Sequence, residues 1–466
     1  MAQQINTPTP EIEKWHSRWQ RNRDFVDGEE AVKSKGELYL PKVRVDDSFA
    51  EYHAHLQRTG FFPAAFKIAQ GWMGLIFRKD PTLNASPRAQ LLAGLATRDG
   101  LTLDDLSAWF VRETLITNFT GALVDHPSRE AFPATMSAAD ELRLGFRPYL
   151  ARYTAENILE VKRGFIGMQI GLVHVRLLED DGKQVRELLI NDAGQYEVRI
   201  HREANGGFQQ VERFVPKQNG QPLSEIPFVL LNTEDSITPT PSLLENAVGL
   251  NHQHYQLESQ LAAAIHLTQA PIATITGYVP AQDDDGNEIV TTWPIEPGAV
   301  WEFPDKDVEV DCHIYEPKGQ ELVINKMRDL KDALSAIGHS ILAPEKPAPE
   351  AAETQLIRRA AENAMLADFT KRIASRIERA YSKWGVWIDG QPVTYALNLD
   401  FVPQPMAAQQ ATLLSNMVTA GQLSMKTLHE ALKQGELMPL DFDPEVEAQR
   451  ISEEQIDLPP IAPLGE

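Results

Sequence analysis

The residues best suited to chemistry in this chain are a group of histidines and its single cysteine. His252, His254 and His266 fall in one stretch with helical spacing, and Cys312 directly precedes His313. Histidine and cysteine are common zinc ligands, so a metal site is the first chemistry to test. Residues two apart on a helix point to different faces, and neighbours on a strand point to opposite sides. The spacing therefore argues against a metal site and favours ordinary packing or polar contacts.

The common catalytic and phosphate-binding motifs do not occur in the sequence. It has no GxxxxGK[ST] loop, no GxGxxG, no HExxH and no GxSxG. The acidic stretch Asp283–Glu288 resembles a calcium loop, but its carboxylates do not have calcium-loop spacing, so a solvated hairpin tip is the better interpretation. We therefore expect no catalytic residue, no cofactor and no metal, and a protein that is not an enzyme.

Composition limits the class of protein further. The chain has 466 residues, one cysteine and a formal net charge of −22. Its length allows roughly two to four domain-sized cores. A single cysteine excludes an internal disulfide and fits a reducing cytoplasm. Non-specific DNA binding needs Lys and Arg on the phosphates, so the charge indicates either simple solubility or a protein that handles polyanions without gripping them.

Neither a membrane span nor a signal peptide is predicted. No run of eighteen apolar residues exists. The N-terminal residues Met1–Trp15 have neither a basic start nor an apolar core, which argues against a secretory signal.

The elements that position these residues are helical at first and then form a sheet. Apolar spacing predicts helices over Glu11–Ala31, Phe61–Phe77 and Leu103–Thr120. From about Pro148 the apolar period changes to two, which predicts a mixed sheet. Its predicted strands include Leu172–Leu178, Gln195–Ile200 and Ile226–Leu231, and a separate buried strand is predicted before it at Gly121–Asp125.

Two long helices then bracket a proline- and glycine-rich insert. Apolar stripes predict these helices over Ser242–Thr268 and Gln320–Leu342, the first extending roughly 40 Å at ~1.5 Å per residue. The insert is predicted to contain the strands Ile272–Thr276, Ala299–Phe303 and Val308–Ile314.

A stiff loop and a third long helix complete this region. The loop Ala343–Glu353 contains three prolines, so it is extended and leads into a helix predicted over Thr354–Trp384. A strand near Val393–Phe401 and helices over Ala407–Gly421 and Ser424–Gly435 follow. Beyond Gly435 we expect an acidic, proline-bearing tail with frayed ends.

Several short sequence motifs occur along the chain, and their order is informative. They are Glu37–Pro41, Gly71–Lys79, Gly121–Asp125, Arg147–Tyr149, Ile226–Phe228, Asn251–Tyr255, Ala270–Gly277 and Ala352–Ala361. Their order and spacing, over most of the chain, resemble the portal proteins, or head-to-tail connectors, of tailed bacteriophages. The last string, AETQLIRRAA at the head of the third long helix, is the most telling.

The resemblance implies an α+β portal fold with a wing, stem helices, a β-containing clip and a helical crown. The implied parts are the N-terminal wing at 1–240, stem helix 1 at 241–269, the clip at 270–317, stem helix 2 at 318–343, the tunnel loop at 344–354, the long helix and strand of the wing at 355–400, and a short crown with an acidic tail at 401–466. The crown is shorter than in the family, so its helix count stays open.

The resemblance also implies a function and a location. Portal proteins form a ring, usually dodecameric, at one vertex of the capsid, and double-stranded DNA passes through it in packaging and ejection. Expected partners are further copies of the chain, the major capsid protein, the terminase packaging motor, a tail adaptor protein and the passing DNA, with no membrane. The chain would be assembled in the host cytoplasm and located in the virion.

Physical reasoning selects the residues that would line the channel. An acidic lining repels phosphate and keeps friction low, whereas Lys and Arg would hold the DNA. The predicted lining residues are Glu345, Lys346, Glu350 and Glu353 of the tunnel loop, and Lys326, Asp329, Lys331 and Asp332 of the second stem helix. The predicted docking residues of the clip are Gln282, Asp283, Asp284, Asp285 and Asn287.

Two other interpretations remain open. The first is another structural virion protein, such as a minor capsid or adaptor component, although adaptors are usually much smaller. The second is a cytoplasmic enzyme of unknown type, which would need a deep pocket with convergent titratable groups. A ring with a central hole, seen by imaging, would exclude most enzymes.

Overall fold

The computed structural model shows two compact units, Met1–Leu399 (unit 1) and Asp400–Glu466 (unit 2). Helices and strands are combined without regular alternation, so the predicted α+β class is confirmed. The residues that the structure describes are 4–42, 47–127, 132–133, 135–204, 206–218, 220–269, 272–276, 309–313, 320–338, 352–401, 408–435, 437–438 and 442–457.

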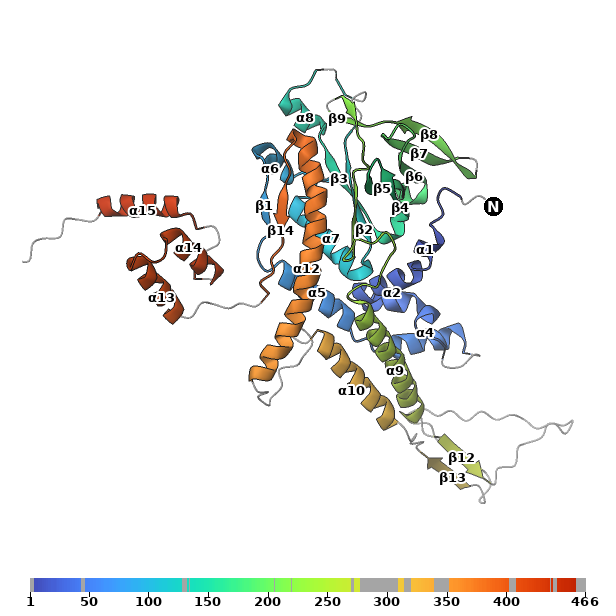
Figure 1. Ribbon diagram of the computed structural model, residues 1–466. Helices are drawn as coiled ribbons and strands as arrows, with labels where there is room; N and C mark the ends of the chain where they lie inside the picture. The colour runs from blue at the N-terminus through green and yellow to red at the C-terminus, as the bar shows by residue number, and fades with distance from the viewer. Residues whose placement is uncertain are drawn as a thin grey trace, which may run out of the picture. The chain divides into compact units, whose positions relative to one another are not determined.

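The first third of unit 1 is mainly helical (Figure 1). Its elements are α1 (Pro10–Glu13), α2 (His16–Asp27), α3 (Glu29–Ser34), η1 (Gly36–Leu38), α4 (Phe49–Arg58), α5 (Ala64–Ile76), β1 (Thr82–Asn84), α6 (Pro87–Ala93) and α7 (Leu103–Thr117). The helices predicted at Phe61–Phe77 and Leu103–Thr120 are confirmed as α5 and α7. The single helix predicted over Glu11–Ala31 is wrong, because α2 ends at Gly28, whose φ of 103° lies outside the helical region.

The ends of α7 follow from its local sequence. The Thr102 side chain accepts a hydrogen bond from the Asp105 backbone N–H, and the Asp105 carboxylate accepts one from the Thr102 backbone N–H. This capping box satisfies two backbone donors that the first helical turn leaves unpaired. At the other end Asn118 takes the left-handed conformation and directs the chain into the first buried strand.

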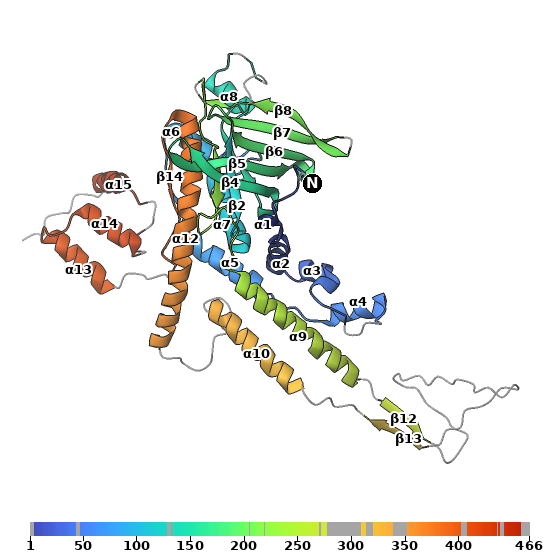
Figure 2. The same cartoon turned by 45° about the vertical axis from the view of Figure 1, so that its right-hand side comes forward.

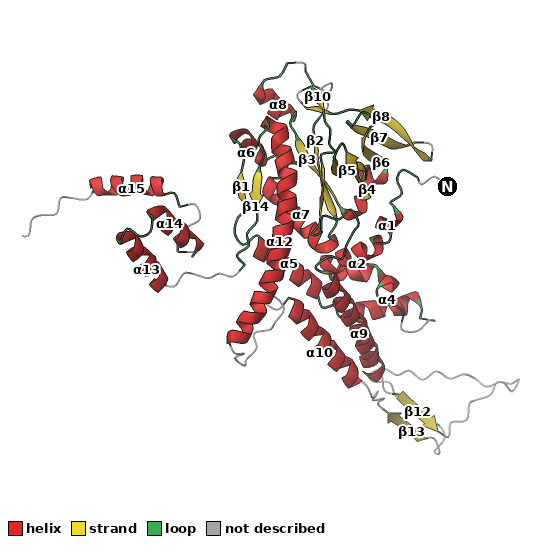
Figure 3. Ribbon diagram, in the orientation of Figure 1, coloured by secondary structure: helices red, strands yellow, loops and turns green. Residues whose placement is uncertain are grey.

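Two antiparallel sheets follow (Figure 3). A three-stranded sheet has the order β11–β2–β3, and a five-stranded sheet runs β4 to β8 in chain order. The bounds are β2 (Thr120–Asp125), β3 (Tyr149–Tyr153), β4 (Ile158–Ile166), β5 (Gln169–Glu179), β6 (Gln184–Ile190), β7 (Tyr196–Ala204), β8 (Gly207–Phe214) and β11 (Phe228–Leu231), with a small pair β9 (Lys217–Gln218) and β10 (Gln221–Pro222), and the short helices α8 (Ala138–Leu144), η3 (Ala155–Asn157) and η4 (Asp180–Gly182). The predicted change to a period of two is confirmed, but the predicted mixed sheet is wrong, because the strands form separate sheets whose pairings are antiparallel.

The hydrophobic core lies between these sheets and the N-terminal helices. Trp19 of α2 stacks on Phe119 with ring centroids 5.7 Å apart, and both are buried with Val175 and Leu177 of β5. Burying side chains of this size stabilises the fold by about 1.5–3 kcal/mol each. The remaining buried members of this core include Ile12, Tyr153, Ile158, Leu188, Val198 and Leu230.

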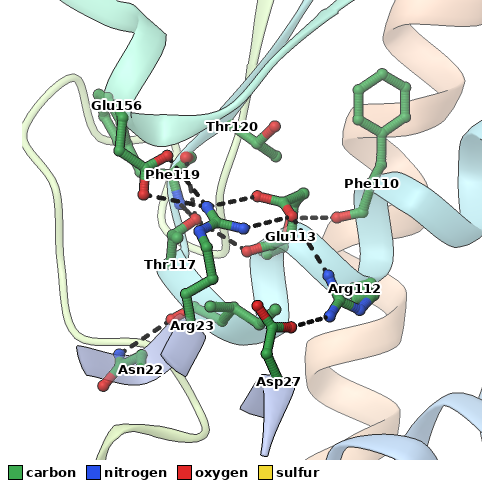
Figure 4. A network of polar contacts seen from close by, with 12 residues as sticks. Asn22, Arg23, Asp27, Phe110, Arg112, Glu113, Thr117, Phe119, Thr120 and Glu156 are labelled. Atoms are coloured by element: carbon green, nitrogen blue, oxygen red, sulfur yellow. Dashed lines mark hydrogen bonds and ion pairs between the residues drawn. The ribbon is translucent and has the colours of Figure 1, made fainter. Parts of the chain in front are cut away.

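A buried polar network ties α2 to α7 and η3 (Figure 4). Both guanidinium NH groups of Arg23 donate to Glu113, at 2.9 and 3.0 Å, and one of them also contacts Glu156 at 3.1 Å. On the surface side Arg112 donates to Asp27 at 2.9 Å. The Glu113 carboxylate is almost fully buried, and without Arg23 it would keep only a longer contact of 3.7 Å with Arg112 among the described residues, so the loss of Arg23 should cost up to about 3–5 kcal/mol.

The rest of unit 1 contains the long helices. The bounds are α9 (Glu245–Gln269), β12 (Ile272–Thr276), β13 (Glu309–His313), α10 (Gln320–Ile337), α12 (Ala352–Asp389) and β14 (Thr394–Ala396). The three predicted long helices and the strands at 272–276 and 308–314 are confirmed. The strand predicted at 393–401 is shorter, and it pairs with β1. The predicted strand 299–303 and the predicted end of the second helix at Leu342 lie outside the described residues.

Unit 2 is helical. It contains α13 (Ala408–Thr419), α14 (Met425–Gln434) and α15 (Pro444–Asp457). The first two helices were predicted, and the Ser424 side chain caps α14 by accepting from the Thr427 backbone N–H. Helix α15 was not predicted, and the expected frayed end of the tail lies outside the described residues. Glu445 and Glu447 lie in the first turn of α15, where their negative charges interact favourably with the helix dipole and stabilise the helix.

Candidate functional site: the paired helices α9 and α10

Helices α9 and α10 pack against each other along an apolar seam. Met327, Leu330 and Leu334 of α10 are buried, at the three- and four-residue spacing of one helix face. Figures 1 and 2 both show α10 beside α9. We call Glu245–Ser259 the root of α9, and Gln260–Gln269 together with Gln320–Ile324 of α10 the outer end of the pair.

The root of α9 is anchored at its first residue. Glu245 accepts a hydrogen bond from Arg18 Nε at 2.6 Å and lies 3.5 Å from Arg21. Both arginines belong to α2, so the negative charge fixes the start of α9 against that helix. A carboxylate in the first turn also interacts favourably with the helix dipole.

Asn251 connects the root to α5. Its Nδ2 donates to the Phe62 carbonyl at 2.8 Å, and its Oδ1 accepts from the Ala65 backbone N–H at 3.0 Å. Ala65 lies in the first turn of α5, where backbone donors have no partner within the helix. The buried side chain of Asn251 in α9 therefore caps the N-terminus of α5.

The histidines of α9 serve packing and anchoring. His252 Nε2 lies 2.9 Å from the Tyr39 carbonyl, and the Tyr39 hydroxyl in turn donates to Asp24 at 2.6 Å. His254 is buried beside Phe62, with ring centroids 5.6 Å apart. Among the described residues its two ring nitrogens have no hydrogen-bond partner. Burial, and then the positive charge of Lys331, lower the pKa of His254 to about 4.

The outer end of the pair is exposed and apolar. Leu322 is 75% exposed, and Ile265 and Ile324 are also exposed. Leu322 and Ile324 are two residues apart on α10, so their side chains leave the helix on different sides and do not form one patch. Nothing in the described part of unit 1 covers them.

The predicted channel-lining residues of α10 are on the surface. Lys326, Asp329, Lys331 and Asp332 are all exposed. The Lys331 ammonium lies 5.3 Å from the centre of the Phe62 ring, so it turns toward α5 and α9. With Arg328, this face carries three bases and two acids, a net charge of +1, so the predicted acidic lining would have to come from other residues.

The other predicted site residues cannot be placed. Glu345, Lys346 and Glu350 lie outside the described residues, and Glu353 lies in α12 where side chains are not described. The predicted clip residues Gln282, Asp283, Asp284, Asp285 and Asn287 also lie outside them.

Three of the strings singled out in the sequence, Gly121–Asp125, Arg147–Tyr149 and Ile226–Phe228, meet in space. A Cβ at Gly121 would lie 2.2 Å from Phe228 Cζ, so β2 and β11 can pack only with glycine there. The Pro148 carbonyl accepts from Trp384 Nε1 of α12 at 3.1 Å. The Tyr149 hydroxyl donates to Asp125 at 2.7 Å. These strings therefore hold the sheet to the long helix.

Sequence reasoning missed one cluster of charged residues. Asp235 forms ion pairs with Arg163 and Arg376. These residues are far apart in the sequence and belong to no recognisable sequence motif. Only the folded chain brings them together. Separately, no group of three or more His, Cys, Asp or Glu side chains in the described ranges is arranged to hold a metal ion. Nor does any described helix combine the length and apolar character needed to cross a bilayer.

Comparisons with known proteins give a family match and distant structural neighbours. A family model described as a domain of unknown function, DUF4055, matches residues 243–387, about a third of the chain, from the start of α9 nearly to the end of α12. A search of curated proteins finds no match.

Among the solved structures that match are chains from gene transfer agent (GTA) particles. A chain of the neck of an empty particle, computed with C6 symmetry, is 12% identical with a TM-score of 0.42, covering 81% of this chain and 92% of its own length. A chain of the native virion is 12% identical with a TM-score of 0.40, covering 86% and 98%. A chain of the native neck, computed with C12 symmetry, is 13% identical with a TM-score of 0.40, covering 81% and 92%.

The three neighbours are chains of particle necks and of a virion. At such scores only a loose arrangement of elements is shared. The function therefore has to be inferred from the residues of this chain.

Proposed function

We propose that this chain is a portal subunit, which forms a ring at one capsid vertex and surrounds a channel for double-stranded DNA. The observation that carries the proposal is the α9–α10 pair. It is anchored by buried polar contacts at the root of α9, and its outer end exposes Leu322, Ile324 and Ile265. An apolar end left uncovered by its own chain favours packing beside the same helices of neighbouring copies.

The order of elements supports the same proposal. A long helix, an insert with the strands β12 and β13, a second helix and then the 38-residue helix α12 correspond to the proposed stem, clip, stem and wing order. In this proposal the clip docks the terminase motor and later the tail adaptor, and the wing contacts the major capsid protein. The ring would be part of the virion, with twelve subunits as in the family.

Low friction on DNA is the physical requirement for a conduit. The chain has a net charge of −22, so neighbouring copies bring no overall attraction for phosphate. The exposed face with Lys326, Asp329, Lys331 and Asp332 is nearly balanced in charge, which neither grips nor strongly repels DNA. We propose that this face lines the channel together with Glu345, Lys346 and Glu350 of the tunnel loop and with Glu353, which lies in the first turn of α12.

Imaging of the purified chain tests the ring directly. Negative-stain electron microscopy and mass photometry should show closed rings with a central hole. A protein that stays a single protomer, alone and in assembled particles, would contradict the proposal. A closed ring would also exclude a monomeric enzyme.

The channel face is tested by charge reversal. The double variant Asp329→Lys/Asp332→Lys should still form rings but package DNA several-fold more slowly, because replacing two acids with two bases changes the charge of each subunit by +4 and attracts phosphate. The matched control is Asp181→Lys/Asp192→Lys, which changes two exposed acids in sheet turns. Equal packaging rates for both variants would remove this face of α10 from the channel.

A further inference from the structure

Three arginines from two distant segments surround one carboxylate in unit 1. Arg163 of β4 lies 2.6 Å from the Asp235 carboxylate, and Arg376 and Arg379 of α12 lie 3.3 and 3.8 Å from it. A fourth, Arg372, lies next to them and pairs with Asp368 at 2.8 Å. Four arginines against Asp235 and Asp368 leave two positive charges in a chain whose overall charge is strongly negative.

The cluster is not electrostatically satisfied by the protomer. Arg376 Nε is buried and has no hydrogen-bond partner among the described residues. Burial lowers the pKa of Arg376, and although Asp235 raises it, the charges of Arg379, Arg163 and Arg372 lower it further. Half of the Arg379 side chain remains exposed, so an added anionic group can reach the cluster from solvent.

An exposed apolar hairpin tip continues the same surface. Phe165 and Ile170 are opposite each other on β4 and β5, and they are 77% and 68% exposed. Met168 in the turn is 99% exposed. Phe165 is two residues from Arg163 on the same strand, so both side chains leave the same face of the sheet, about 7 Å apart.

Glycine makes this hairpin possible. Gly164 and Gly171 are paired across the strands, and a Cβ at Gly171 would lie 2.9 Å from Ile166 Cδ1. Ile166 therefore folds over the glycine on one face of the hairpin. Phe165 and Ile170 are left on the other face, where nothing in the described part of the chain covers them.

We propose that this basic–apolar face, formed by Arg163, Arg376, Arg379, Phe165, Met168 and Ile170, binds a second copy of this chain. Arginine and large apolar side chains together are the composition of protein interfaces rather than of simple anion sites. Copies with a charge of −22 repel one another, so a ring needs local attraction where they meet. The partner of an uncompensated basic surface must be acidic, and the neighbouring copy is acidic as a whole.

This inference rests on the proposed ring, and it names one side of the contact between subunits. A ring is closed by heterologous contacts, in which one face of each copy meets a different face of the next. In that contact the apolar hairpin tip would be buried against the neighbouring subunit, and the arginines would fix the orientation of the two subunits relative to each other.

The test uses the full-length protein and two variants of this face. Arg379→Glu and Phe165→Ser/Ile170→Ser should each raise the dissociation constant for self-association about tenfold or more, measured by sedimentation and mass photometry. Arg143→Glu and Leu91→Ser are the matched controls, because both residues are exposed elsewhere on unit 1. Raising the salt concentration should weaken association of the wild type and have less effect on Arg379→Glu.

The outcomes separate the two proposals. Rings in the wild type that are lost in both variants, with unchanged thermal unfolding, support this face as a subunit contact. Rings that persist in both variants overturn the contact and leave the portal proposal standing. Failure of the wild type to associate overturns both proposals. If the apolar variant fails to fold, Arg379→Glu alone decides the result, since Arg379 is half exposed.

Discussion

The two ends of the α9–α10 pair differ in almost every physical respect. At the root, Asn251, His252 and His254 are embedded among α2, α5 and η1, and their polar atoms are either paired with backbone groups or held without charge. At the outer end, Leu322, Ile324 and Ile265 face solvent. The root is therefore stabilised by contacts within its own protomer, whereas the outer end has apolar side chains that a second molecule could cover. The comparison predicts that changes at the root affect folding, whereas changes at the outer end affect assembly.

Among changes at the two ends of the α9–α10 pair, removal of the Asn251 amide should have the largest effect on folding. Asn251→Leu leaves the Phe62 carbonyl and the Ala65 backbone N–H without partners, which should lower the free energy of unfolding by about 3 kcal/mol. Chemical denaturation measures this value. Gln253→Leu, an exposed position on the same helix, is the matched control and should change it by less than about 0.5 kcal/mol. Equal effects of the two variants would show that α9 is not anchored through Asn251.

Acid should weaken the root through His254. The pKa of this histidine is about 4 in the folded chain and about 6.5 in the unfolded chain. Between these values the unfolded chain binds the proton and the folded chain does not, so stability is full above pH 6.5 and falls as pH decreases toward 4. The loss from this group should reach about 2 kcal/mol at pH 5. Denaturation at pH 7 and pH 5 measures it.

The assignment to His254 is checked by two variants. His254→Leu should remove about 2 kcal/mol of the difference between pH 7 and pH 5. His53→Leu, at an exposed position, should leave the difference unchanged. An identical pH dependence in wild type and His254→Leu would mean that other groups cause it.

The contact between α4 and α9 should contribute less. Ser259 Oγ lies 2.7 Å from His55 Nε2, and both side chains are buried. Ser259→Ala should lower the free energy of unfolding by about 1 kcal/mol, the usual value of a hydrogen bond. Ser375→Ala on the exposed face of α12 serves as the control. If Ser259→Ala left the free energy of unfolding unchanged, the contact between Ser259 and His55 would not contribute to the stability of the root.

Changes at the outer end should have the smallest effect on the protomer. Leu322→Ser/Ile324→Ser should change the free energy of unfolding by less than about 0.5 kcal/mol at high dilution, because both side chains are exposed. The same variant should weaken ring formation in mass photometry. A loss of more than about 1.5 kcal/mol in the protomer would show that these residues are covered by their own chain, and the contrast between the two ends would disappear.

The periodic elements could be predicted from the sequence, but the contacts between them could not. The apolar stripe Met327, Leu330 and Leu334 has a repeat that identifies both a helix and its buried face. The break at Gly28 was missed because a glycine within a helical pattern is tolerated unless the chain needs φ above zero there.

The candidate site shows the same limit. The sequence located α9 and α10, and it placed Lys326, Asp329 and Asp332 on an exposed face. It could not show that Lys331 lies over Phe62, because a contact between residues 269 positions apart has no local signal. The arginines around Asp235 were missed for the same reason, since β4, the loop after β11 and α12 meet only in the folded chain.

Helix α12 has a mechanical consequence. It runs without interruption for 38 residues, about 57 Å at ~1.5 Å per residue, and its C-terminal half is fastened by Tyr381 to the Leu103 carbonyl and by Trp384 to the Pro148 carbonyl. A stiff helix that is fixed at one end transmits a force applied at its other end. A displacement of the N-terminal end of α12, at Ala352, would therefore strain the first turn of α7 and the start of β3.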